Sequence, residues 1–254
     1  MIILEYLQQA VIQALKMLAI GLLPYLIFAL LMQKISNSIR TRLALLLSVK
    51  GYIYLTAPGV MIHELSHAFF CLIFRHKVVK MKLFSPEKDG TLGYVNHVYN
   101  PKSRFQRIGN FFIGTGPVWG GVFMLWLVTR LLLPSDILSL ERGLLEAVFN
   151  LARYIISVEF WSRWQSYCWL YLILTISSHV TLSPPDLVGA TAGASTLIVT
   201  VFLFGLALGW HSSLSSFVDR ILHNMLVYTS SILGLFGFIT LLIAIILMIF
   251  VRKR

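Results

Sequence analysis

A His-Glu-x-x-His sequence at residues 63–67 is the clearest chemical signal in the chain. On a helix, residues four apart share a face, so the imidazoles of His63 and His67 can bind one metal ion. Glu64 can then act as general base toward a water molecule. The motif predicts a Zn²⁺ site with an activated water molecule. The alternative is a pair of histidines that hydrogen-bond within a helix bundle, with Glu64 as their partner.

The residues around this motif are mostly apolar. Hydrophobic residues make up 57% of the 254-residue chain and charged residues only 12%, about half the charged share of a soluble domain. Five runs without Asp, Glu, Lys or Arg are near or beyond the about 17–25 residues of a membrane-spanning helix; they are 17–33, 108–129, 164–185, 187–218 and 221–251. We therefore expect a multi-pass membrane protein, in which an ionisable Glu64 marks a functional site.

The chain is expected to form a single integral-membrane domain, residues 1–254, of the all-α polytopic class with one small β-hairpin. Its core would cover 45–210, with additional spans at both ends. The hydropathy pattern predicts six transmembrane helices, at about 10–32, 45–74, 108–132, 164–181, 187–210 and 225–251. Residues 137–157 have apolar residues at helical spacing with charged residues between them, which is typical of a helix at the membrane interface or of a short connecting helix.

The segment after the HExxH helix is the one convincing β element in the sequence. Two runs rich in β-forming residues flank a Ser-Pro-Glu-Lys-Asp-Gly turn at 85–90, which predicts a β-hairpin within residues 76–100.

The basic residues predict orientation in the membrane. Basic segments favour the cytoplasmic side, so we expect the hairpin, the Arg252-Lys253-Arg254 tail and the N-terminus on the cytoplasmic side of a bacterial cytoplasmic membrane. Three basic residues then fall on the opposite side: Lys34, Arg40 and Arg42. Orientation explains the net charge of +11 more simply than nucleic-acid binding, which we do not expect.

A catalytic zinc ion takes three protein ligands and keeps one position open. Asp186 is the only other acidic residue in the part of the chain predicted to lie in the membrane, so we expect its carboxylate to complete the set. The pattern Ser183-x-x-Asp186, with Pro184 between, also resembles a capping box at a helix start. The two roles are compatible, because a capped helix start would hold the carboxylate rigidly.

Together these residues resemble the site-2 protease family of intramembrane zinc metalloproteases (peptidase family M50). The resemblance covers roughly residues 50–190 and rests on three sequences in the same order: HELSH at 63–67, the Gly-Pro sequence at 114–121 and Pro-Pro-Asp at 184–186. It implies that the substrate is a transmembrane segment of another membrane protein. Family members have an Asn where this chain has Ser178 and His179, so the resemblance implies His179 as the group that orients the oxyanion. It leaves open whether His179 or Asp186 is the third zinc ligand.

The resemblance also gives the hairpin a role. In this family a β element after the HExxH helix pairs with the backbone of the unwound substrate, as an exposed strand edge can. We expect the edge along 92–98, with substrate-binding residues Leu92, Gly93, Tyr94, Val95, Asn96 and His97. The alternative is a solvated hairpin that does not touch the substrate.

Two other classes of protein are compatible with the same residues. The first is a membrane regulator that binds zinc without cleaving peptides; the intact Glu64 argues against it, because a non-catalytic zinc site does not need that base. The second is a transporter of protons or metal ions, in which the polar groups would form a path across the bilayer rather than a cluster at one depth. The substrate's identity and the oligomeric state do not follow from the sequence.

Overall fold

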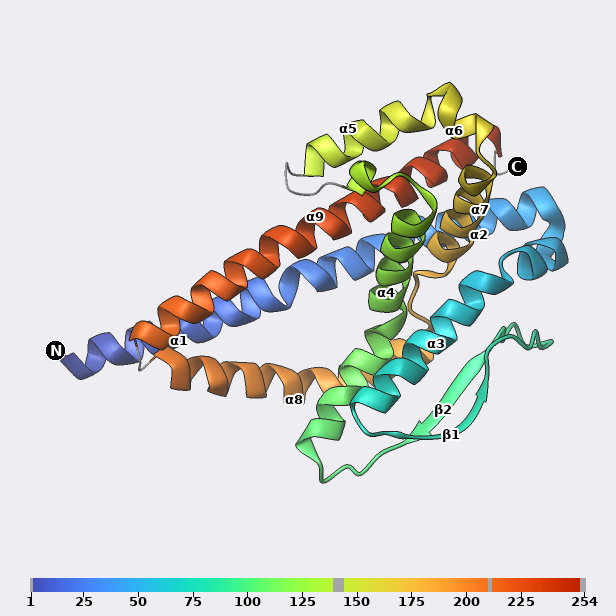
Figure 1. Cartoon of the computed structure of the whole chain (residues 1–254). Coiled ribbons are helices and arrows are strands. Elements are labelled where there is room, and N and C mark those ends of the chain that lie inside the picture. Colours follow the sequence, from blue (N-terminus) through green and yellow to red (C-terminus); the bar gives the residue numbers. More distant parts are fainter. Residues whose placement is uncertain (1, 139–143, 210–211, 252–254) are drawn as a thin grey trace.

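The computed structural model describes residues 2–138, 144–209 and 212–251 (Figure 1). They form a helical molecule with one two-stranded hairpin. The elements in chain order are α1 (Ile2–Gly21), α2 (Leu23–Leu55), α3 (Ala57–Ile73), β1 (Lys77–Lys82), β2 (Tyr94–Val98), α4 (Arg104–Leu132), η1 (Ser135–Leu138), α5 (Leu144–Ile155), α6 (Val158–Ser162), α7 (Trp164–His179), α8 (Pro184–Gly209) and α9 (Ser212–Phe250).

Several helices fit a membrane protein. Within the described ranges, four helical stretches are long and apolar enough to cross a bilayer: Leu4–Leu55, Arg104–Leu132, Pro184–Leu208 and Leu214–Phe250. The predicted count of six spans is therefore not confirmed. The apolar helix α3 has 17 residues and α7 has 16, both short of the about 20 that a span needs, while α1 and α2 follow each other as one long stretch.

The polar stretch 33–42 belongs to α2, although a loop was expected there between two predicted spans. No Gly or Pro interrupts the sequence between Pro24 and Gly51, so nothing stops the helix. Pro24 lies in the first turn of α2, where its missing N–H is tolerated. The helix bends at Ser48, whose φ of 67° and ψ of 162° are not helical, and its last turn then leads toward α3.

The predicted span 45–74 is wrong as a single helix. The chain changes direction at Thr56, which ends α2 and precedes α3, and Pro58 occupies the first turn of α3. The HExxH motif therefore lies near the middle of its own short helix. That helix packs against α4 and α7.

The predicted β-hairpin within 76–100 is confirmed. Strands β1 and β2 are antiparallel, with Lys77 opposite Val98 and Lys82 opposite Tyr94. The connection turns at Gly90, whose φ of +92° suits a residue without Cβ. Every residue of β1 is exposed, and both strands lie beside α3 (Figure 1).

The core surrounds α4, which crosses the middle of the molecule (Figure 1). Large apolar side chains from α4, α6, α7 and α9 fill it, among them Leu125, Phe160, Trp169, Ile173 and Phe236. The expected helix at 137–157 is represented by η1 and α5, and residues 139–143 lie outside the described ranges, as does the basic tail at 252–254. Helix α5 is amphipathic, with buried Ala147 and Leu151 and exposed Leu145 and Phe149.

Candidate metal centre

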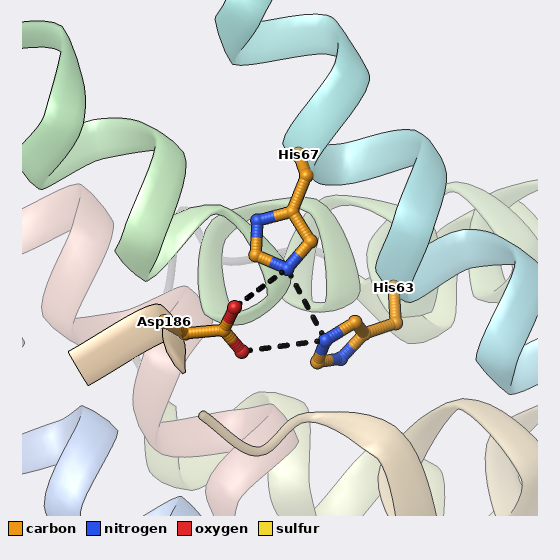
Figure 2. A group of neighbouring side chains, drawn as sticks. All are labelled: His63, His67 and Asp186. Atoms are coloured by element: carbon orange, nitrogen blue, oxygen red, sulfur yellow. Dashed lines mark hydrogen bonds and ion pairs between the residues drawn. The ribbon is translucent and has the colours of Figure 1, made fainter. Parts of the chain in front are cut away.

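Three predicted ligands converge from two helices that are distant in sequence (Figure 2). The Nε2 atoms of His63 and His67 on α3 are 3.3 Å apart. The Asp186 carboxylate in the first turn of α8 lies 3.5 Å from His63 Nε2 and 3.2 Å from His67 Nε2. Within the described ranges this is the one group of three such side chains that could hold a metal ion.

Backbone carbonyls from two other helices fix the imidazole rings. His67 Nδ1 donates to the Ile113 carbonyl of α4 at 2.7 Å, and His63 Nδ1 donates to the His179 carbonyl at the end of α7 at 3.1 Å. A carbonyl oxygen only accepts, so Nδ1 of each ring carries a proton. In their neutral form these rings would present the lone pair of Nε2 to the centre, as metal-bound histidines do.

The predicted capping box at the start of α8 is confirmed. The Ser183 N–H donates to Asp186 Oδ2 at 2.7 Å, and the Asp186 N–H donates to Ser183 Oγ at 3.3 Å. The carboxylate that faces the two histidines is thus held by the helix start from which it projects. This hydrogen bond leaves Asp186 Oδ1, 3.2 Å from His67, directed at the centre.

The spacing of these atoms fits a metal ion. Two ligands bound to a tetrahedral ion at about 2.0–2.1 Å lie about 3.3 Å apart. The separation of the two histidine Nε2 atoms, 3.3 Å, matches that value. The carboxylate approaches with two different oxygens, Oδ1 at 3.2 Å from His67 and Oδ2 at 3.5 Å from His63. His63, His67 and Asp186 could therefore hold such an ion once one carboxylate oxygen faces both rings.

Glu64 lies beside the cluster, in a cavity of about 680 Å³ that also contains the three candidate ligands. Glu64 is only 7% exposed. The hairpin approaches it closely: a Cβ built on Gly93 would be 2.8 Å from Glu64 Cγ. The lining of the same cavity includes all six predicted substrate-binding residues, Leu92, Gly93, Tyr94, Val95, Asn96 and His97.

His179 also borders the cavity, but its ring is hydrogen-bonded to Thr56 and Tyr52 rather than to the candidate ligands. Its Nε2 lies 2.9 Å from Thr56 Oγ1 and 3.2 Å from the Tyr52 hydroxyl. Because the Thr56 hydroxyl donates to the Tyr52 carbonyl, it accepts from His179 Nε2–H. The candidate metal group consists of His63, His67 and Asp186 without the His179 ring, whereas the His179 backbone carbonyl orients His63.

A second pair of histidines fastens the hairpin to the helices. His76 donates from Nε2 to the Gln106 carbonyl at 2.8 Å, so its Nδ1 accepts from Nδ1 of His97, 3.0 Å away on β2. Burial, and then the nearby charges of His76 and His67, lower the pKa of His97 to about 4. The neutral form that makes this hydrogen bond is thus favoured.

Several polar residues of the cavity wall were not predicted as site residues. Among them, Gln33, Asn37 and Arg40 come from α2, and Asn110 comes from α4. Arg40 was expected on the opposite side of the membrane from the hairpin, yet both border one cavity. The spacing of Gln33, Asn37 and Arg40, four and then three residues apart, indicates one shared polar face if the stretch is helical.

Comparisons of the chain with protein-family models, with curated proteins and with solved structures give no match. The chemistry of the site therefore rests on its own residues.

Proposed function

We propose that the protein is an intramembrane zinc metalloprotease that cleaves peptide bonds in or near transmembrane segments of other membrane proteins. One observation carries this proposal: two histidines of an HExxH helix and an aspartate from a distant helix converge at metal-ligand spacing, with Glu64 in the same cavity. Ionisable groups buried in a membrane protein are costly and usually functional, which favours this interpretation over a purely structural cluster.

The donor set favours zinc. Two imidazoles and one carboxylate are ligands typical of catalytic zinc sites, and His63, His67 and Asp186 would supply them. The ion, when bound, would lower the pKa of a coordinated water and polarise the carbonyl of the scissile bond.

The side chains of the chain would carry the remaining steps. The Glu64 carboxylate would take a proton from the attacking water and pass it to the nitrogen of the leaving amine. His179 stays a predicted contributor at the oxyanion. Its carbonyl would keep the His63 ring oriented throughout.

The hairpin would bind the substrate. A transmembrane helix hides its scissile carbonyls in internal hydrogen bonds, so the segment must unwind before it is cut. β2 pairs with β1 along one edge, and its residues Tyr94–His97 border the cavity. The other edge of β2 could pair with an extended substrate and replace the hydrogen bonds lost on unwinding. If the hairpin is cytoplasmic, cleavage occurs near the cytoplasmic face.

Substitution of Glu64→Gln tests this function directly. In purified protein with a model transmembrane peptide, we expect zinc content to be retained and cleavage to fall by about 10²–10⁴-fold, because the general base is removed. Glu87→Gln, at an exposed position of the hairpin turn, is the matched control and should cleave normally. Equal cleavage by the Glu64→Gln protein would refute the mechanism. Zinc binding without any cleavage by the unaltered protein would indicate the non-proteolytic regulator, and metal or proton flux in vesicles the transporter.

A further inference from the structure

A polar face of α2 forms one wall of the cavity. Gln33, Asn37 and Arg40 follow one another at helical spacing and all border it. Gln33 is fixed to the chain that leads into the metal centre: its amide nitrogen donates to the Leu182 carbonyl at 2.8 Å, and its amide oxygen accepts from the Leu182 N–H at 2.6 Å. The next residue, Ser183, caps Asp186. The α2 wall is thus anchored beside the carboxylate ligand.

Arg40 is the cation of this wall, and its charge has no anionic partner in the described ranges. Its Nη2 donates to Asn37 Oδ1 at 3.0 Å, and none of the ion pairs found there involves it. A guanidinium has five N–H donors and stays charged. Arg40 belongs to the polar stretch 33–42 of α2 and borders the cavity that contains the candidate metal ligands.

The neighbouring basic residues of α2 differ from Arg40. Arg42 donates to the carbonyl and to the hydroxyl of Ser38, at 3.5 and 2.7 Å, one turn earlier on its own helix. Lys34 is exposed. Neither borders the cavity. Among these three cations, Arg40 alone is directed at the space that holds the candidate metal ligands.

We propose that Arg40 binds a carboxylate of the substrate, so that the protease selects segments with an Asp or Glu close to the scissile bond. The inference rests on the proposed function and names its substrate class. A guanidinium recognises a carboxylate through two parallel N–H···O bonds, and Asn37, already bonded to Arg40, would hold the fork in place.

The geometry sets where that acidic residue lies. Arg40 is seven residues beyond Gln33, which corresponds to about 10 Å along a helix. Gln33 lies beside the segment that carries Asp186. An extended peptide covers about 3.3 Å per residue. For a substrate that runs parallel to α2 with its scissile bond level with Gln33, the carboxylate would be roughly three residues from the bond that is cut.

Paired peptides test this specificity. A transmembrane peptide of about 20 apolar residues carries one Glu, moved stepwise along the segment, and its partner carries Gln at the same position. For the best position we expect kcat/KM to be about tenfold or more higher with Glu, as for a hydrogen bond to a charged group. Arg40→Gln should remove the difference, and Arg40→Glu should reverse it toward a Lys peptide. A third peptide, with a free C-terminal carboxylate and no Glu, distinguishes a side-chain carboxylate from a terminal one.

Lys34→Gln is the matched control, since it removes one positive charge from the same helix outside the cavity, and it should keep the preference for Glu. Equal kcat/KM for the Glu and Gln peptides, or a loss in Arg40→Gln that is the same for both, would overturn the role of Arg40 while the protease stands. Peptide binding to the Glu64→Gln protein, followed by fluorescence anisotropy, separates the two proposals. A preference for Glu that depends on Arg40, in a protein whose unaltered form cleaves nothing, would support the carboxylate site and refute the protease.

Discussion

Helices α4 and α8 approach each other closely at Gly114, beside Asp186, and a methyl group there should damage metal binding from a distance. A Cβ built on Gly114 would be 2.6 Å from the Ala190 nitrogen and nearer still to the Asp186 carbonyl oxygen. Both atoms belong to the backbone of α8, which cannot move aside as a side chain can. Gly114→Ala therefore pushes the start of α8 away from α4.

The size of this displacement follows from the contact distances. Ordinary contacts of a Cβ begin at 3.4 Å, so α8 must retreat by about 1 Å near Asp186. Metal–ligand bonds tolerate about 0.2 Å. The carboxylate would leave the coordination sphere, while His63 and His67, anchored on α3, would stay in place. We expect metal affinity to fall by about 100-fold or more, since a disturbed outer-shell contact alone typically reduces affinity 10–100-fold.

Metal affinity by competition with a chelator, together with metal content by mass spectrometry, measures the effect. Gly189→Ala is the control: it adds the same methyl group to α8, within one turn of Asp186, but meets no atom within 4 Å, and it should bind metal normally. Circular dichroism must show that both variants keep their helices. Wild-type affinity in a folded Gly114→Ala protein would mean that Asp186 is not a ligand or that α4 and α8 do not meet there.

Three further changes test other parts of the site. Ser183→Ala removes one half of the capping box and should lower the unfolding free energy by about 1 kcal/mol, measured in denaturant titration; no change in stability or metal affinity would contradict the proposed link between the cap and the carboxylate. Gly93→Ala places a methyl group 2.8 Å from both Glu64 Cγ and the Leu83 carbonyl oxygen, so cleavage should fall at least about tenfold with metal binding intact, whereas loss of the metal would refute this placement of the hairpin. Acid should loosen the hairpin. The pKa of His97 lies at about 4 in the folded protein against about 6.5 in the unfolded chain. The neutral His97 ring therefore contributes fully to the stability of the hairpin above pH 6.5, and this contribution, at most about 3 kcal/mol, is lost as the pH falls toward 4. Hydrogen exchange of residues 94–98 at pH 7 and pH 4.5 measures this, and equal protection in both, after correction for intrinsic rates, would refute it.

The parts of the site that the sequence predicted are those that depend on local geometry. Residues four apart on a helix always share a face, so the approach of His63 to His67 follows from their spacing alone. The capping box between Ser183 and Asp186 is likewise decided within one turn. The hairpin follows from a Pro/Asp-Gly turn between two β-rich runs. None of these depends on how distant helices pack.

The α2 wall depends on contacts between distant residues, and the sequence pattern did not predict it. From the sequence alone, a polar stretch such as 33–42 fits a loop in water as well as a helix whose polar side chains hydrogen-bond within the protein. Gln33 finds both backbone groups of Leu182, 149 residues away. The choice between Asp186 and His179 as third ligand also depends on contacts between residues distant in sequence. Thr56 and Tyr52 both lie within hydrogen-bond distance of His179 Nε2.

The centre also connects the helices of the bundle. The rings of His63 and His67 on α3 are held by carbonyls of α7 and α4, and the third carboxylate comes from α8. In lipid, the hydrophobic effect does not drive helices together, so polar contacts of this kind contribute a larger share of the assembly. An ion that binds only where all four helices meet adds to that share by mass action, about 4 kcal/mol when its free concentration is 1,000 times its dissociation constant. The same contacts that aim three candidate ligands at one point would thus couple the binding of an ion to the packing of these four helices.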